Sequence, residues 1–573
     1  MDLKTLEETD IFSLYSEAES YARMIGMYED TDKNFRFYNG NQWDGVKLKG
    51  IEPVQLNFIR PIVRFKVGTM NQNLWAINYS AENYDNKNFM QTAMKVCDLL
   101  NKKSAKMWEN DNRDYKIRAI TKIAAINDEA PVYIEYDKNK NQTIFTLLSK
   151  NDIYFGNEND SDIQSQPYIL VKQRMPLINA RNLAESYGVP KNEIENILPD
   201  AETYEESGEA AKYEKDDMVT IVTKLYKKDG KVYYSKSARC VIIKKETNTG
   251  LHLYPIVHFI WEEKEGSARG EGEVRGLISN QIEVNKILTR RLVVTKSTAY
   301  PIKAVNTKYI TNPNEINNIG GTLKTESEAA IDINKIFAIT QPAQMSPDVE
   351  KLQMDLIDIT RSLAGASESA TGDIKPDEAS GKAILAVQQA QQLPLVEQIA
   401  TLKRFIEDAA RIELDMMIVY NSEGMKLEEE IDDPMTGEKV YQLVDIPGSV
   451  LQELKANVKV DITPVSAFDR YAQEISLENL LKAGWFAPDR IGQLKSYVET
   501  LPDNSTMPKQ RIMDMIKKQE QEQQKIAQIQ AQAQQMIQRA NTFINEDVDA
   551  QAQQMAEAQQ IAQIPQMATS QRL

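Results

Sequence analysis

The apolar positions of the chain follow a helical period most clearly between Ser346 and Leu363. Ser346 is a suitable N-cap, and Pro347 suits the first helical position. Apolar side chains then recur at helical spacing at Val349, Leu352, Leu356, Ile359 and Leu363. Gly365 is a suitable C-terminal cap. The pattern predicts one helix over 346–364.

A second periodic run follows after a small, polar stretch. Residues 365–378 predict a loop, and residues 379–420 predict a much longer helix that contains Pro394. Proline removes one backbone hydrogen bond at a cost of about 3 kcal/mol, so we expect a kink at Pro394. Some forty residues would span about 60 Å. A ring of identical chains could bury one side of such a helix against the neighbouring copy. The alternative is a long helix buried in an ordinary large domain.

The first 265 residues combine helical patterns with paired strand patterns. Helices are expected over 1–35 and 88–127, with Leu14, Ala18, Tyr21, Ala22 and Ile25 on one side of the first. The Asn39-Gly40 pair predicts a turn, and Asn57 is a cap candidate for the next helix. Strands are expected at Ala130–Tyr136 with Thr143–Leu148, at Met218–Tyr226 with Lys231–Ile243, and at Pro255–Trp261. The fold class predicted is α+β with antiparallel strand pairs.

Glycines at 266, 270, 272 and 276 precede a further helical pattern. They do not form a dinucleotide-binding loop, because Arg275 stands where the third glycine is needed. We expect a flexible entry to a helix running from Glu273 to about Lys296. Residues 273–308 hold seven basic and two acidic side chains. This basic belt is either a solvated helix face or a contact for DNA or for an acidic partner.

Composition narrows the class of protein. The 573 residues have a net charge of −16 and a mean hydropathy of −0.49, so any DNA contact must be local, weak or transient. No transmembrane helix or signal peptide is expected. Cys97 and Cys240 suit a reducing compartment, and with only two histidines a zinc site is not expected.

No catalytic set emerges from the sequence. Gly381-Lys382 resembles part of a phosphate-binding loop, but Ala383 replaces the required Ser or Thr. We therefore expect no enzyme, no cofactor and no metal site. At the C-terminal end, residues 519–573 contain 18 glutamines and a helical stripe that predicts a coiled-coil-like helix or a partly disordered tail.

Several segments, in their order, resemble the portal proteins of tailed bacteriophages. The segment Phe37-Tyr38-Asn39-Gly40-Asn41-Gln42-Trp43, the Asn57 helix, and Gly270-x-Gly272 followed by Leu277, Gln281 and Asn285 carry this resemblance. It implies a portal-type fold assembled as a ring, with a mostly helical stem, channel and crown and an α+β wing. The segments would be wing (1–265), first stem helix (266–299), clip (300–345), second stem helix (346–364), tunnel loop (365–378), kinked channel helix (379–420), wing strands (421–465), crown (466–518) and a glutamine-rich barrel or tail (519–573).

The resemblance also implies a function. A ring of about twelve copies would occupy one capsid vertex of the virion, after synthesis in the host cytoplasm, and would pass double-stranded DNA during packaging and ejection. Expected partners are the terminase large subunit, a head–tail adaptor, and the major capsid and scaffold proteins, with no membrane. Candidate channel residues are Thr371, Asp373, Lys375 and Lys382, and candidate stem and clip contacts are Lys286, Arg290, Arg291, Lys296, Lys303 and Lys308.

The alternative is a non-portal structural virion protein, such as a scaffold or tail adaptor with a coiled-coil C-terminus. An enzyme of unknown type is a third hypothesis.

Overall fold

The computed structural model divides into two units, Met1–Pro464 and Val465–Leu573. It describes residues 8–46, 51–82, 84, 87–200, 218–299, 303–305, 307–318, 322, 324–325, 337–339, 345–366, 393–432, 439–464, 498 and 515–516. The predicted crown and glutamine-rich end therefore lie outside the described residues, apart from three positions. The described sheets and the helices that cover them belong to the first unit.

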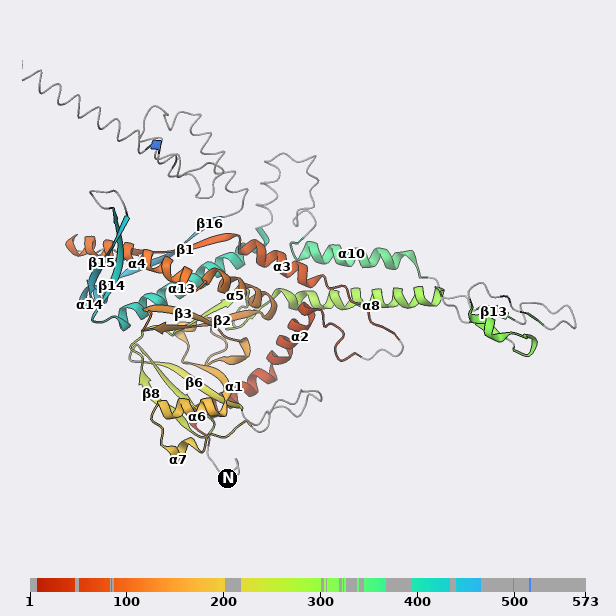
Figure 1. The fold of residues 1–573 in the computed structure, drawn as a ribbon, viewed down its shortest axis with the longest axis horizontal. Helices are drawn as coiled ribbons and strands as arrows, with labels where there is room; N and C mark the ends of the chain where they lie inside the picture. The colour runs from red at the N-terminus through yellow and green to blue at the C-terminus, as the bar shows by residue number, and fades with distance from the viewer. Residues whose placement is uncertain are drawn as a thin grey trace, which may run out of the picture. The chain divides into compact units, whose positions relative to one another are not determined.

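The two largest sheets described in this unit are antiparallel (Figure 1). The larger has the order β4-β5-β6-β7-β8, from Ile153–Phe155, Tyr168–Pro176, Met218–Lys228, Lys231–Ser237 and Ile242–Asn248. The smaller has the order β3-β2-β9, from Gln142–Leu147, Glu129–Asp137 and Ile256–Ile260. The predicted hairpin of β2 and β3 is confirmed. The expected strand over 231–243 is instead two strands, because the chain turns between Ser237 and Ile242.

Two further strand pairings complete the unit, one between distant segments and one within a hairpin. Strand β1 (Asn73–Ala81) pairs antiparallel with β16 (Ala456–Pro464), which joins the beginning of the unit to its end. Hairpin β14–β15 (Gly424–Asp432 and Lys439–Pro447) lies against α4 (Lys87–Asn110), with α14 (Gly448–Glu453) beside it. The α+β fold class with antiparallel pairs is thus confirmed.

Helices cover the sheets and end at local signals. The N-terminal region forms α1 (Asp10–Met24) and α2 (Met27–Asn39), separated by Gly26 in the left-handed region at φ 74°. The predicted apolar side of 1–35 is partly wrong, since Tyr21 and Ile25 are exposed whereas Phe12 and Tyr15 are buried. Helix α2 ends at Gly40 (φ 94°), which confirms the predicted turn.

Four further helices belong to the body of the unit. Helix α3 (Ile59–Met70) begins after Asn57, whose Oδ1 accepts the Arg60 backbone N–H at 3.2 Å. Helix α5 (Arg113–Asn127) packs on β2, and α6 (Leu177–Ser186) with the short α7 (Lys191–Ile194) packs beside the larger sheet. The predicted helical segment over 88–127 is thus two helices.

Two of the four clustered glycines, Gly270 and Gly272, are close-packed, which corrects the expectation of a flexible entry to the helix. Short strands β10 (Glu262–Glu263) and β11 (Gly270–Glu271) pair here. A Cβ at Gly270 would lie 2.2 Å from Ile260 Cγ2, and one at Gly272 would lie 2.8 Å from the Asp128 nitrogen. Glycine is required at both positions because neighbouring chain occupies the space of a side chain.

The segment predicted as a clip is described only in short pieces. Strands β12 (Lys303–Val305) and β13 (Phe337–Ile339) pair antiparallel, and 3-10 turns occur at Thr307–Tyr309 and Pro313–Asn317. The described pieces of this segment are therefore short strands and turns.

Candidate functional site

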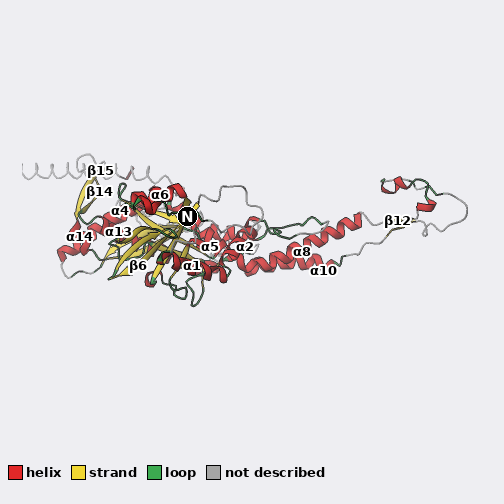
Figure 2. Cartoon of the chain, turned by 90° about the horizontal axis from the view of Figure 1, so that it is seen from below, coloured by secondary structure: helices red, strands yellow, loops and turns green. Residues whose placement is uncertain are grey.

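A pair of antiparallel helices extends from the body of the unit: α8 (Glu273–Ala299) and α10 (Pro347–Leu363) lie side by side in both Figures 1 and 2. Ser346 caps α10 as predicted, because its hydroxyl accepts the Asp348 backbone N–H. Two side-chain contacts set the register of the pair. Asn280 Nδ2 donates to Thr360 Oγ1 at 2.9 Å, and Arg291 Nη1 donates to Gln353 Oε1 at 2.8 Å. We call this pair the stem helices.

A ladder of polar side chains attaches α8 to the body. Gln281, Asn285 and Thr289, at intervals of four residues, accept the backbone N–H groups of Phe58, Leu56 and Val54 at 3.1, 3.1 and 3.2 Å. Backbone N–H groups of the extended segment 54–58 thereby have hydrogen-bond acceptors although no strand pairs with this segment. The signal for this role is visible in the sequence as polar residues at helical spacing within an apolar stripe.

The predicted basic belt does not form one continuous patch. Lys286 pairs with Glu283 at 2.7 Å, Arg291 with Glu350 of α10 at 3.0 Å, and Lys296 with Glu52 at 3.4 Å. Arg290 is exposed and has no ion pair among the described residues. Lys308 lies in a 3-10 turn, and Lys303 lies in β12, where side chains are not described. Lys286, Arg291 and Lys296 are therefore already paired within the chain.

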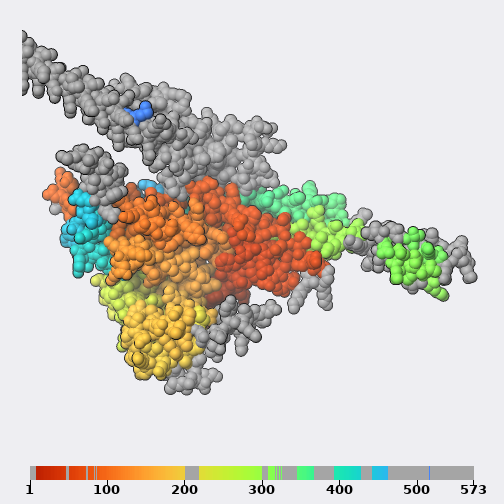
Figure 3. Space-filling model, in the orientation of Figure 1, coloured from red at the N-terminus to blue at the C-terminus, as the bar shows by residue number. Residues whose placement is uncertain are grey.

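On its outer side α10 carries an apolar stripe, and the described residues of the chain leave three of its four side chains uncovered. Leu352, Ile359 and Leu363 are 51, 56 and 80% exposed, and Leu356, on the same side, is half-buried. The side that α10 buries is instead formed by Gln353, Ile357 and Thr360. In the space-filling view, α10 forms an open edge of the projecting pair (Figure 3). The predicted periodicity is thus confirmed, but its apolar side faces away from the body that the structure describes.

The described residues on either side of 367–392 meet at the end of α10. Gly365, at φ 67°, ends α10, and a Cβ on it would lie 2.8 Å from Pro394 Cβ. The chain therefore leaves the stem and returns to the same place. Thr371, Asp373, Lys375 and Lys382 lie outside the described residues, so their role at a channel stays a prediction.

Pro394 precedes the described part of the long helix. It lies in a 3-10 turn, Leu393–Leu395, and α13 runs over Val396–Tyr420. A proline just before a helix costs no internal hydrogen bond. Residues 367–392 are outside the described part, so the kink at this position stays a prediction.

Helix α13 is a core helix of a single chain. Leu402, Phe405, Ile406, Ala409 and Ala410 are each at most 2% exposed, and the helix packs against β9, β2 and β16. The expectation that the long helix needs a neighbouring copy to cover it is wrong for this half. The alternative, a helix buried in a large domain, describes residues 396–420.

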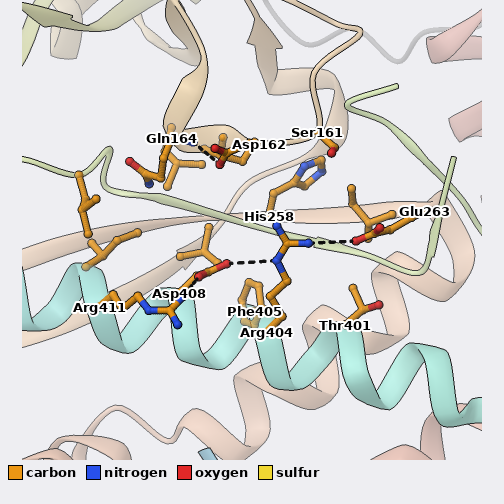
Figure 4. A pocket seen from close by; sticks show the side chains of 16 residues that line it. Ser161, Asp162, Gln164, His258, Glu263, Thr401, Arg404, Phe405, Asp408 and Arg411 are labelled. Carbon is orange, nitrogen blue, oxygen red and sulfur yellow. Dashed lines mark hydrogen bonds and ion pairs between the residues drawn. The ribbon is translucent and has the colours of Figure 1, made fainter. Parts of the chain in front are cut away.

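A cavity of about 340 Å³ lies between α13, β9 and the turn at 161–164 (Figure 4). Its charged groups pair with one another: Arg404 lies 3.5 Å from Glu263 and 3.9 Å from Asp408, and Arg411 lies 2.6 Å from Asp408. Burial raises the pKa of Asp408, although both arginines oppose that shift. The residues that line the cavity therefore offer paired charges rather than a nucleophile held beside a base.

A second hollow, of about 460 Å³, was not predicted from the sequence. Five lysines line it, from α4, the β2–β3 turn and β14: Lys102, Lys103, Lys106, Lys140 and Lys426. Burial lowers the pKa of Lys103 to about 8. The only sequence signal was the recurrence of lysine on one side of α4, which also suits an ordinary solvated helix.

Metal-ligating side chains do not gather in groups of three or more anywhere in the described segments. None of the helices in those segments has both the length and the apolar character needed to cross a lipid bilayer.

Together, a mixed α/β body and two projecting helices with a connecting pair of short strands are the features expected of a portal subunit. A comparison with family models agrees: the model described as phage P22-like portal protein matches residues 128–571, so this chain belongs to that family. No curated protein matches the sequence. The chain is therefore a portal protein of a tailed phage, a structural component of the virion capsid rather than a member of an enzyme family. Membership of this family decides against the alternatives of a scaffold or a tail adaptor.

Proposed function

We propose that copies of this chain form a closed ring, of about twelve subunits, that conducts double-stranded DNA through one capsid vertex. The observation that carries this proposal is the apolar stripe of α10, in which Leu352, Ile359 and Leu363 are exposed and have no apolar partner among the described residues of their own chain. Full burial of one such side chain stabilises by roughly 1.5–3 kcal/mol. A stripe along a projecting helix suits a heterologous contact, and heterologous contacts close into rings when the rotation allows.

The loop geometry suits a channel constriction. Residues 365 and 394 are in contact, so both ends of the segment between them lie at the end of the stem. In a ring this segment would recur around the axis, and Lys375 and Lys382 would form two cationic rings in a chain of net charge −16. Sparse positive charge lets DNA slide, whereas many phosphate contacts would hold it through counterion release.

The partners expected from family membership remain part of the proposal. The terminase large subunit would dock during packaging, and a head–tail adaptor would replace it afterwards, both near the segment 300–345 between the stem helices. Capsid and scaffold proteins would contact the body. The tunnel loop, clip, crown and barrel assignments are proposed on the same basis.

Size and shape of the purified protein test the ring. We expect particles near twelve times 65.2 kDa, with a central opening in negative-stain images. Ile359→Asp places a charge in the stripe and should shift most of the protein to monomers. Met354→Asp is the matched control, because Met354 is 54% exposed on the opposite side of α10 and should leave rings intact. Wild-type protein that stays monomeric at high concentration would refute the proposal.

A further inference from the structure

The stem helix α8 presents an outer side that neither the described body nor α10 covers. One side of α8 meets the body through Gln281 and Asn285, and a second meets α10 through Asn280 and Arg291. At roughly 100° per residue, Lys286 and Arg290 fall together on the remaining side. Val293, which is 37% exposed, borders them, whereas half-buried Ile282 at the margin packs against the core of the body. This outer side is both basic and partly apolar.

The free side of α10 has the complementary character. Asp355 lies beside the apolar stripe, one helical turn from Leu352 and Ile359. It is exposed and has no ion pair among the described residues. The acidic and apolar surface of α10 therefore matches the basic and apolar surface of α8 in both charge and hydrophobicity.

The levels of these groups along the stem also match. The contacts Arg291–Gln353 and Asn280–Thr360 mark two heights at which α8 and α10 are level. Counting between them along the antiparallel pair places Asp355 at the height of the turn from Lys286 to Arg290. Rotation about an axis parallel to the helices keeps every residue at its height, so these groups stay level in a neighbouring copy.

We propose that α10 of each copy lays its stripe and Asp355 on the outer side of α8 in the next copy, with Asp355 between Lys286 and Arg290. This inference rests on the proposed ring and names its contact. It assigns the basic outer side of α8 to an acidic surface of the same protein rather than to DNA. Lys286 can exchange partners, because its pair with Glu283 is exposed and such pairs are weak.

Charge exchange tests the contact. Arg290→Glu and Asp355→Arg should each lower the association of stem helices, by about tenfold per contact, as expected for a close interfacial charge pair. The double variant should restore ring assembly, measured as the ring fraction at matched concentration by mass photometry. Asp358→Arg is the matched control: Asp358 is equally exposed on α10 but lies farther from the stripe, so its rings should persist.

Crosslinking tests the same contact by position. With Cys97 and Cys240 replaced by alanine, the double variant Arg290→Cys/Asp355→Cys should form disulfide-linked ladders of chains under oxidation. Either single cysteine should form none. Undiminished rings in both single charge variants, with no ladder, would overturn this contact while the ring itself stands. Loss of DNA retention in Arg290→Glu with normal rings would overturn it in favour of DNA. A wild-type chain that forms no ring would instead refute the proposed function.

Discussion

A buried ion pair attaches helix α13 to the rest of the body, and its removal gives a calculable result. Arg113 of α5 and Glu413 of α13 are both fully buried. Arg113 Nη1 donates to Glu413 Oε2 at 3.1 Å, and Nη2 donates to Glu413 Oε1 and, at 2.7 Å, to Thr143 Oγ1. Thr143 donates in turn to Glu413 Oε1 at 2.6 Å. Three elements, α5, β3 and α13, meet at this cluster.

Replacing only the acid should destabilise the body strongly. Glu413→Leu leaves the buried Arg113 guanidinium with Asp111, whose Oδ2 lies 3.7 Å from Arg113 Nε, as its remaining counter-charge. Breaking a buried pair costs about 3–5 kcal/mol, and we expect a loss near the lower end of that range. The double variant Arg113→Met/Glu413→Leu removes both charges, so it should recover at least about 2 kcal/mol of that loss. The ring of Phe145, 4.4 Å from the Arg113 guanidinium carbon, would then contact the methionine side chain.

Urea unfolding, followed by tryptophan fluorescence, measures these differences. Comparing all variants in the Ile359→Asp background removes the contribution of assembly. Hydrogen exchange should locate the loss, with faster exchange in α13 and β3 of Glu413→Leu. Equal destabilisation by the single and double variants would refute the reasoning, because the penalty would then not come from the unpaired charge.

Two further predictions concern the junction of β9 and α8. Gly270→Ala should lower the free energy of unfolding by about 1–3 kcal/mol, because its Cβ would overlap Ile260. Gly276→Ala is the control: open space surrounds Gly276, so this change should be neutral or stabilising. Equal urea midpoints for the two variants would contradict the prediction. Burial opposes the charge of Glu129, but Arg269, His258 and Lys150 outweigh burial and hold its pKa well below the usual range. This stability is present above about pH 4.5 and is lost as the pH falls below that value. The urea midpoint of the wild type should therefore fall more steeply between about pH 5 and 3 than that of Glu129→Gln, and parallel curves would contradict it.

Local signals predicted the elements of this fold well. The cap at Ser346, the turn at Gly40 and the hairpin of β2 and β3 depend on neighbouring residues, so they are legible in the sequence. The pairing of β1 with β16 is not, because its partners are separated by almost the whole unit. The close packing at Gly270 was not predicted for the same reason, because the atoms that require glycine belong to Ile260 and Asp128 and not to residues next to it in the sequence.

The stem shows where periodicity alone fails. The same spacing that marks Leu352 and Ile359 of α10 also marks Leu402 and Phe405 of α13, yet the first pair is exposed and the second is buried. The helical period of apolar residues shows that a helix has an apolar side, but it does not show which surface covers that side. Charges are equally ambiguous: the sequence placed Arg290 and Arg291 in one belt, whereas they lie on different sides of α8, and only Arg291 contacts α10 among the described residues.

The division of apolar surface between body and stem explains how one chain can fold first and assemble afterwards. The body covers α13 with its own strands, so its core does not depend on other copies. Polar contacts at two levels join the stem helices, while Leu352, Ile359 and Leu363 of α10 remain exposed. A free chain therefore keeps its fold while presenting a narrow adhesive stripe flanked by charge. The stripe supplies affinity between copies, and the charged residues beside it supply register, since a shift by one turn would separate Asp355 from Lys286 and Arg290.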